Sequence, residues 1–138
     1  MSFREKSAWI TLVSVLVCFG VYFAELVVNE SHIGPLTSLH LLLLSVIALV
    51  ALQVVLTLIA AKTTPKDGRA PADERERLIQ LRSHTLGYYV LMGLALALFV
   101  PVHFGHSALD MANFALLAVV TATLTVAVAQ IVMFRRGL

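Results

Sequence analysis

Histidine and carboxylate side chains gather near one end of the apolar segments, and both residue types bind transition metals. His103 and His106 stand three residues apart and Asp110 follows at four, a spacing that predicts one shared side of a helical turn. We expect His40 at a similar depth on a neighbouring helix, an arrangement suited to axial ligation of a haem. The candidate ligands of a transition metal or haem are therefore His40, His103, His106, Glu25 and Asp110. The alternative is that these histidines only cap helix ends and bond to headgroups or water.

A polar stripe runs along the first apolar segment. Its residues follow one another at steps of three and four, which keeps them on one helix face: Ser7, Thr11, Ser14, Cys18, Tyr22, Glu25 and Asn29. One interpretation is a path for a solute or ion, with Ser14, Cys18, Tyr22 and Glu25 as its lining. The other is a face that packs inside a helix bundle, where small polar residues allow close approach. Glu25 lies about one turn below the outer boundary, where interfacial water lowers the cost of its charge.

No motif for catalysis accompanies these residues. The sequence has no glycine-rich phosphate loop, no serine motif with a base and no intramembrane aspartate pair. Its single cysteine, Cys18, excludes an intrachain disulfide. We therefore expect a protein that is not an enzyme.

The composition indicates which elements position these residues. The chain has 138 residues, of which 59% are hydrophobic and only 13% charged. A soluble domain of this size leaves too much surface exposed to hide that many apolar side chains, so lipid must surround most of them. We predict an all-α integral membrane protein, a four-helix bundle in one domain over residues 1–138, because open sheets cannot satisfy their backbone groups in lipid.

Four apolar runs are long enough to cross a bilayer, which takes about 20 residues. We predict spans over residues 7–28, 36–61, 85–104 and 109–134. All ten Lys and Arg residues fall before the first span, between the second and third, or after the fourth. Positively charged loops stay in the cytoplasm, which predicts that both termini lie inside.

The segment between the second and third spans, residues 62–84, divides into a linker and a helix. Turn-forming residues fill its first half, and Asp73-Glu74-Arg75-Glu76-Arg77 then opens a helix, with Asp73 as the cap and Glu76 in a capping-box position. Leu78, Ile79 and Leu81 give that helix an apolar side, and no breaker precedes Gly87. We expect it to run straight into the third span, to project into the cytoplasm and to offer a contact surface for a protein partner. Its charges alternate in sign, so no nucleic acid is expected.

Small residues form seams on the last two spans. Gly93 and Ala97 make a pair on the third, and the fourth carries Ala115, Ala118, Ala122, Thr125 and Ala129 at steps of three and four. Such seams let another backbone approach closely. We expect internal packing, with self-association as the alternative.

The stretch Asp73-Glu74-Arg75-Glu76-Arg77-Leu78-Ile79, followed by Gly87-Tyr88-Tyr89, resembles a group of small uncharacterised bacterial membrane proteins. These have four predicted spans and an acidic-Arg-acidic motif before the third. The resemblance implies a bacterial inner-membrane location and brings no activity. Small multidrug exporters also have four spans and a glutamate in the first, but theirs lies deep in the membrane and their loops carry little charge bias, so this chain fits them poorly.

From the sequence we therefore expect a non-catalytic membrane protein with a structural, regulatory or partner-binding role, which also self-associates if the small-residue seams are free. The alternatives are a metal- or haem-binding protein that uses the outer histidines, and a small channel or carrier along the first helix.

Overall fold

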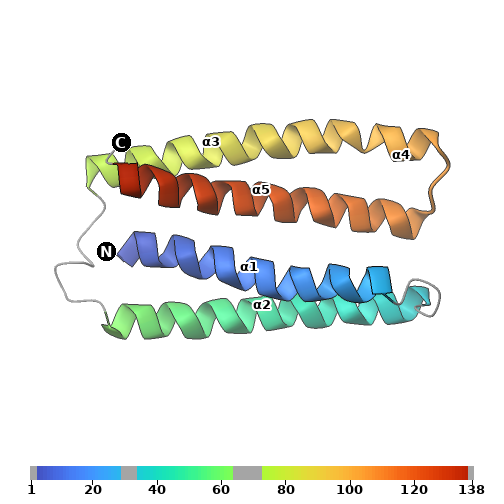
Figure 1. The fold of residues 1–138 in the computed structure, drawn as a ribbon, viewed down its shortest axis with the longest axis horizontal. Helices are drawn as coiled ribbons and strands as arrows, with labels where there is room; N and C mark the ends of the chain where they lie inside the picture. Colours follow the sequence, from blue (N-terminus) through green and yellow to red (C-terminus); the bar gives the residue numbers. More distant parts are fainter. Residues whose placement is uncertain (1–2, 29–33, 64–72, 137–138) are drawn as a thin grey trace. The chain divides into compact units, whose positions relative to one another are not determined.

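The computed structural model describes residues 3–28, 34–63 and 73–136, and within them it contains helices and no strand (Figure 1). The helices are α1 (Phe3–Val28), α2 (Pro35–Thr63), α3 (Glu74–Ala97), α4 (Phe99–His103) and α5 (Ala108–Arg136). The all-α class is confirmed, and the four long helices fit a four-helix membrane bundle. The predicted linker lies largely outside the described residues, as does Asn29.

Four helical segments are long and apolar enough to cross a membrane, so the chain is a multi-pass membrane protein. They are Phe3–Val28, Leu36–Thr63, Glu74–His103 and Ala108–Arg136. Each has between 26 and 30 residues, more than the roughly 20 that the hydrocarbon core requires. The excess must be taken up by tilt or by helix ends that extend beyond the core.

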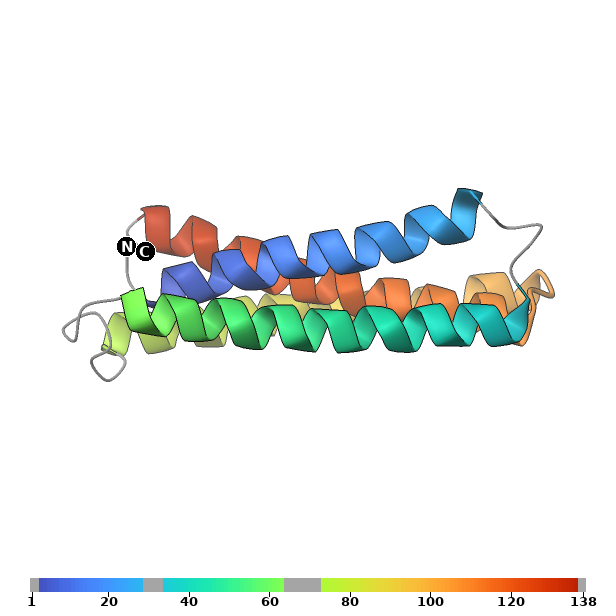
Figure 2. The same cartoon turned by 90° about the horizontal axis from the view of Figure 1, so that it is seen from below.

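The chain divides into two compact units, Met1–Ala70 and Pro71–Leu138. The first is an antiparallel hairpin of α1 and α2, and the second is an antiparallel hairpin in which α3 and α4 pair with α5 (Figures 1 and 2). Our prediction of a single domain over residues 1–138 stays a prediction.

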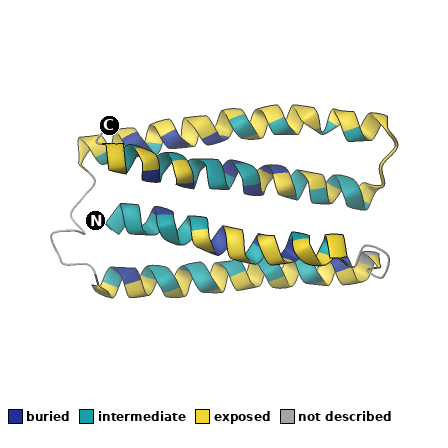
Figure 3. Cartoon of the chain, viewed as in Figure 1, coloured by how far each residue is buried: buried dark blue, intermediate teal, exposed yellow. Residues whose placement is uncertain are grey.

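In the first hairpin, α2 uses only one face for packing. Ser38 and Ala60 are buried, and the half-buried residues Ser45, Leu49 and Leu56 fall on the same face at steps of four and seven. The leucine- and valine-rich remainder is exposed, as Figure 3 shows along most of this helix. An apolar face without a protein partner fits a helix that is surrounded by lipid.

In the second hairpin, the closest approach of α3 and α5 is at Gly87. A β-carbon built there would clash with Cγ2 of Val126 and would lie 3.4 Å from the backbone oxygen of Ala122. Ile79 and Ser83 precede Gly87 at steps of four, and all three are buried. They form the face of α3 that looks toward α5.

This finding changes the predicted seams. Ala118 and Ala122 on α5 are buried as expected, and Ala115, Thr125 and Ala129 are half-buried. Gly93 and Ala97 are exposed, however, and a β-carbon at Gly93 would meet nothing within 4 Å. Our expectation of internal packing for this pair is wrong. A different pair on another face of α3, Ser83 and Gly87, makes the small-residue contact with α5.

Replacing Gly87 with alanine should loosen the second hairpin. We expect Gly87→Ala to be about 1–3 kcal/mol less stable in micelles than Gly93→Ala, because the added methyl meets a valine whose χ1 is stiff in a helix. Both variants gain the same helix propensity, so their difference isolates the packing effect. Unfolding by a denaturing detergent measures it. Adding Val126→Ala should restore Gly87→Ala; equal stability of the two glycine variants would contradict the close contact.

Candidate functional site

The first turns of α3 form a continuous helix with the third span, as predicted. Asp73 caps it in an extended conformation, and its Oδ1 accepts a hydrogen bond of 2.8 Å from the amide of Glu74. Glu74 and Glu76 lie in the first turn, where the helix dipole favours negative charge. The helix then continues through Gly87 to Ala97.

The contact at Gly87 determines which part of α5 lies beside the first turns of α3. Because α3 and α5 are antiparallel and Gly87 faces Ala122 and Val126, the first residues of α3 come level with the last turns of α5. Counting about 20 residues back from Phe104 predicts the inner edge of the hydrocarbon core near Thr85. We therefore expect the turns of α3 before Thr85, next to the end of α5, to lie outside the core.

The leucines of this segment do not share the face that we predicted. Ile79 is only 2% exposed, whereas Leu78 is 44% and Leu81 is 67% exposed. Successive helical residues turn by about 100°, so Leu78 and Leu81 lie opposite the face that packs on α5. The predicted single apolar side is thus wrong. One face is internal and the other is available to a partner.

The predicted contact residues surround this outward face. Asp73, Glu74, Arg75 and Arg77 are exposed and Glu76 is half-buried. Arg82 is also exposed and lies beside Leu78 and Leu81 on the helix surface. We therefore define the α3 outer face as Arg75, Arg77, Leu78, Leu81 and Arg82.

The polar stripe of α1 changes character along its length. Ser14 is fully buried, Cys18 is half-buried and Glu25 is exposed. Tyr22 is 2% exposed and packs edge-on against Phe19 and Phe23, at ring-centroid distances of 6.5 and 5.2 Å. Its ring therefore serves aromatic packing. Within the described residues the buried Ser14 hydroxyl has no hydrogen-bond partner.

Hydroxyls elsewhere in the spans bond to their own helices. The threonines of α3 and α5 donate to the carbonyl one turn back, at 2.7–2.9 Å: Thr85 to Leu81, Thr121 to Leu117, Thr123 to Val119 and Thr125 to Thr121. Ser83, which is fully buried, donates to the carbonyl of Gln80 at 2.9 Å. This back-bonding satisfies polar groups where no water reaches them.

The outer end of the second hairpin turns tightly between α4 and α5. Gly105 has φ +76°, its amide donates to the carbonyl of Val102 at 3.1 Å, and the amide of His106 donates to Pro101 at 3.3 Å. This pair of bonds is the Schellman ending of a helix, in which glycine takes the left-handed conformation. It separates His103, the last residue of α4, from His106. The predicted helical turn that would align His103, His106 and Asp110 is therefore absent.

Asp110 and Ser107 cap α5 reciprocally. The Asp110 carboxylate accepts bonds from the Ser107 amide at 3.1 Å and the Ser107 hydroxyl at 2.7 Å, while the Asp110 amide donates to Ser107 Oγ at 3.2 Å. Nδ1 of His106 lies 3.8 Å from the same carboxylate oxygen, and its ring packs edge-on against Phe114. This cap gives Asp110 a structural role and brings one histidine beside it.

The candidate metal ligands do not gather among the residues that the structure describes. No group of three or more His, Cys, Asp or Glu side chains there could hold a metal ion. His40 is exposed, and its Nδ1 bonds to the carbonyl of Leu36 at 2.7 Å, as expected for a histidine that satisfies its own helix end. Metal or haem binding stays a prediction.

The described residues thus offer two places for function. One is the α3 outer face, near the start of that helix, and the other is the turn between α4 and α5, at the opposite end of the same hairpin. No protein family, curated protein or solved structure matches this chain in the comparisons.

Proposed function

We propose that this chain is a non-catalytic protein of the bacterial inner membrane that binds a cytoplasmic partner protein through the α3 outer face. The observation that carries the proposal is the exposure of Leu78 and Leu81 between arginines, on a helix whose opposite face is held by α5. A patch of leucines ringed by charge is an unusual surface unless something covers it.

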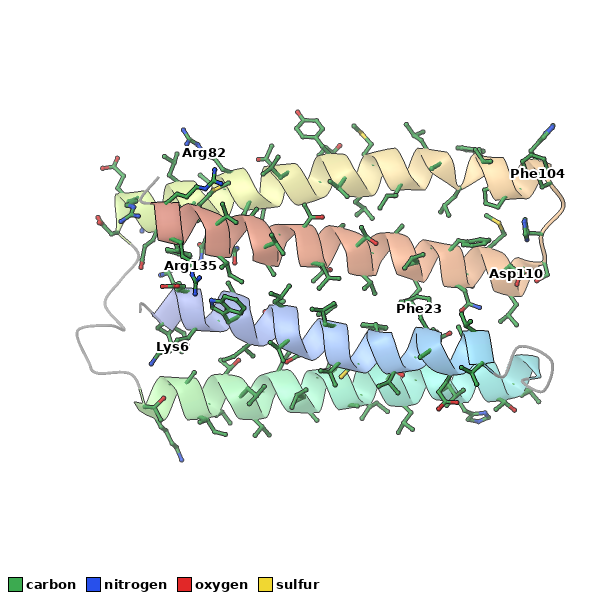
Figure 4. All side chains as sticks on the ribbon, in the orientation of Figure 1. Lys6, Phe23, Arg82, Phe104, Asp110 and Arg135 are labelled. Carbon is green, nitrogen blue, oxygen red and sulfur yellow. The ribbon has the colours of Figure 1, made fainter. Side chains whose placement is uncertain are left out.

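The distribution of charge supports the orientation. Arg4, Lys6 and Lys62 lie where the first hairpin has the start of α1 and the end of α2. In the second hairpin the basic residues gather where α3 starts and α5 ends, where Figure 4 labels Arg82 and Arg135, with Phe104 and Asp110 at the other end of that hairpin. Basic segments are retained in the cytoplasm, which favours both termini inside.

The reach of α3 favours a protein over lipid as the occupant. With the inner edge of the core near Thr85, Leu78 lies about 10 Å and Glu74 about 16 Å beyond it, at 1.5 Å per residue. The headgroup layer is only roughly 5–8 Å thick on each side. Lipid can therefore cover the neighbourhood of Arg82, but not the turn that carries Arg77 and Leu78.

The chemistry of the surface specifies the partner. Leucine side chains at the centre bind an apolar patch, and the arginines beside them bind carboxylates around its rim. The partner is therefore a protein with an acidic rim around an apolar patch. The bacterial inner-membrane location comes from the resemblance of the Asp73–Ile79 motif, and self-association would use Gly93 and Ala97, which the second hairpin leaves exposed.

The topology is tested with single cysteines in a Cys18→Ser background. Ala108→Cys should react with a membrane-impermeant maleimide in intact spheroplasts, because its end of the hairpin carries no basic residue and faces outward. Thr63→Cys should react only after the membrane is opened. Labelling of Thr63→Cys before lysis would contradict the proposed orientation.

Partner binding is tested in two steps. A photo-crosslinking side chain at Leu78 should capture a protein in cells, whereas the same side chain at Met92, inside the core, should not. The captured protein is then purified and its affinity for the full chain is measured. Arg77→Glu with Leu81→Ser should weaken binding about 10-fold or more, because it removes both the charge and the apolar anchor.

The matched control is Arg136→Glu, which makes the same charge change on an exposed residue at the same end. It should leave the affinity within about twofold, since Arg136 is not part of the α3 outer face. If the double variant binds as tightly as the wild type, or if the crosslinker at Leu78 captures only phospholipid, the proposal fails.

A further inference from the structure

An apolar groove runs along the outer half of the second hairpin, between α3, α4 and α5. Its volume is about 520 Å³, within the range of small-molecule sites. His106 stands at its outer end and Thr121 at its inner end. The remaining lining is apolar: Leu94, Ala97, Leu98, Val100, Pro101, Phe104, Phe114, Leu117 and Ala118.

The local sequence explains why a groove lies here. Pro101 has no amide hydrogen, so the carbonyl of Ala97 loses its helical partner and the helix is interrupted at Leu98. Ala97 and Ala118 are too small to fill the space between the helices, and the rings of Phe104 and Phe114 also line it. Closer to the cytoplasm, Gly87 brings α3 and α5 into contact.

The depth of the groove matches one leaflet of the bilayer. From Phe104 to Leu94 the helix rises about 15 Å at 1.5 Å per residue. That is half of the roughly 30 Å hydrocarbon core. The groove therefore begins at the outer headgroups and ends near the membrane midplane, as a single acyl chain does.

The shape of the groove suits a thin, flexible occupant. Ala97 of α3 and Ala118 of α5 both line it, and an acyl chain is thin enough to lie between them. Phenylalanine rings in the lining give it apolar contacts at the level where the headgroup begins.

The polar end of the groove carries a hydrogen-bond donor for a phosphate and an acceptor for an ammonium group. His106 offers an imidazole, and Asp110, whose Oδ2 is 3.8 Å from it, offers a carboxylate that Ser107 holds in place. A phosphate accepts hydrogen bonds from the imidazole, and an ammonium donates to the carboxylate. This pairing fits an amine-bearing zwitterionic headgroup better than a purely anionic one.

We propose that this groove binds one phospholipid of the outer leaflet, with an acyl chain along Ala97 and Ala118 and an ethanolamine headgroup over His106 and Asp110. The site is separate from the α3 outer face, which lies at the other end of the same hairpin, but it shares Ala97 with the seam that self-association would use.

The test is lipid retention by the full chain, measured by native mass spectrometry after purification from nanodiscs of defined composition. Ala97→Leu fills the groove from an exposed position, and we expect it to lower retention of phosphatidylethanolamine about 10-fold. The control is Ala95→Leu, an exposed alanine on the same helix that does not line the groove. It should retain lipid like the wild type.

The headgroup is tested by exchanging phosphatidylethanolamine for phosphatidylglycerol or phosphatidylcholine, which should lower retention severalfold in the wild type and less in Asp110→Asn. Free fatty acid as the sole additive separates the acyl chain from the headgroup. Equal retention by Ala97→Leu and Ala95→Leu would overturn the proposal. So would crosslinks from Leu117→Cys, in a Cys18→Ser background, to the first hairpin or to a second copy, because these would show that protein occupies the groove.

Discussion

The second hairpin depends on the contact of Gly87 with Ala122 and Val126. Because the backbones approach so closely there, the register of α3 against α5 is fixed along their whole length. That register brings Ile79 and Ser83 onto the internal face and leaves Leu78 and Leu81 on the opposite one. A rigid helix end that extends past the headgroups loses little conformational entropy when a partner binds. Preorganised interfaces gain affinity in this way.

A second constraint comes from the bilayer, which leaves no water to bond with polar groups. The threonines of α3 and α5 meet it by bonding to the preceding turn of their own helix. The interruption at Leu98 is tolerated because Pro101 lies within two turns of the outer interface, where the Schellman bonds and the Ser107–Asp110 cap satisfy the turn. The same interruption leaves the groove between α4 and α5. Features that stabilise the turn therefore also shape its candidate lipid site.

Hydropathy and charge were sufficient to predict the helices, because a span of about 20 apolar residues has few other conformations in lipid. The Asp73 cap and the continuity of α3 were likewise readable from residue types. The rotation of each helix about its own axis could not be predicted, since an apolar residue in a span can face either lipid or protein. For this reason residue spacing alone predicts Gly93 and Ala97 as an internal seam, and it predicts Leu78 and Leu81 on the same helix face as Ile79. Gly105 also carried a signal for a turn, and its left-handed conformation is what removes His103 from the expected cluster.

The most direct test of the account is the environment of single spin labels at Leu78, Ile79 and Met92, in a Cys18→Ser background reconstituted in lipid. We expect the label at Leu78 to collide with a water-soluble relaxation agent, the label at Met92 to collide with dissolved oxygen, and the label at Ile79 to be shielded from both. That pattern would establish that α3 leaves the membrane with the face of Ile79 packed on α5 and the face of Leu78 exposed to water. A label at Leu78 that senses oxygen as strongly as the one at Met92, or an Ile79 label open to water, would contradict it.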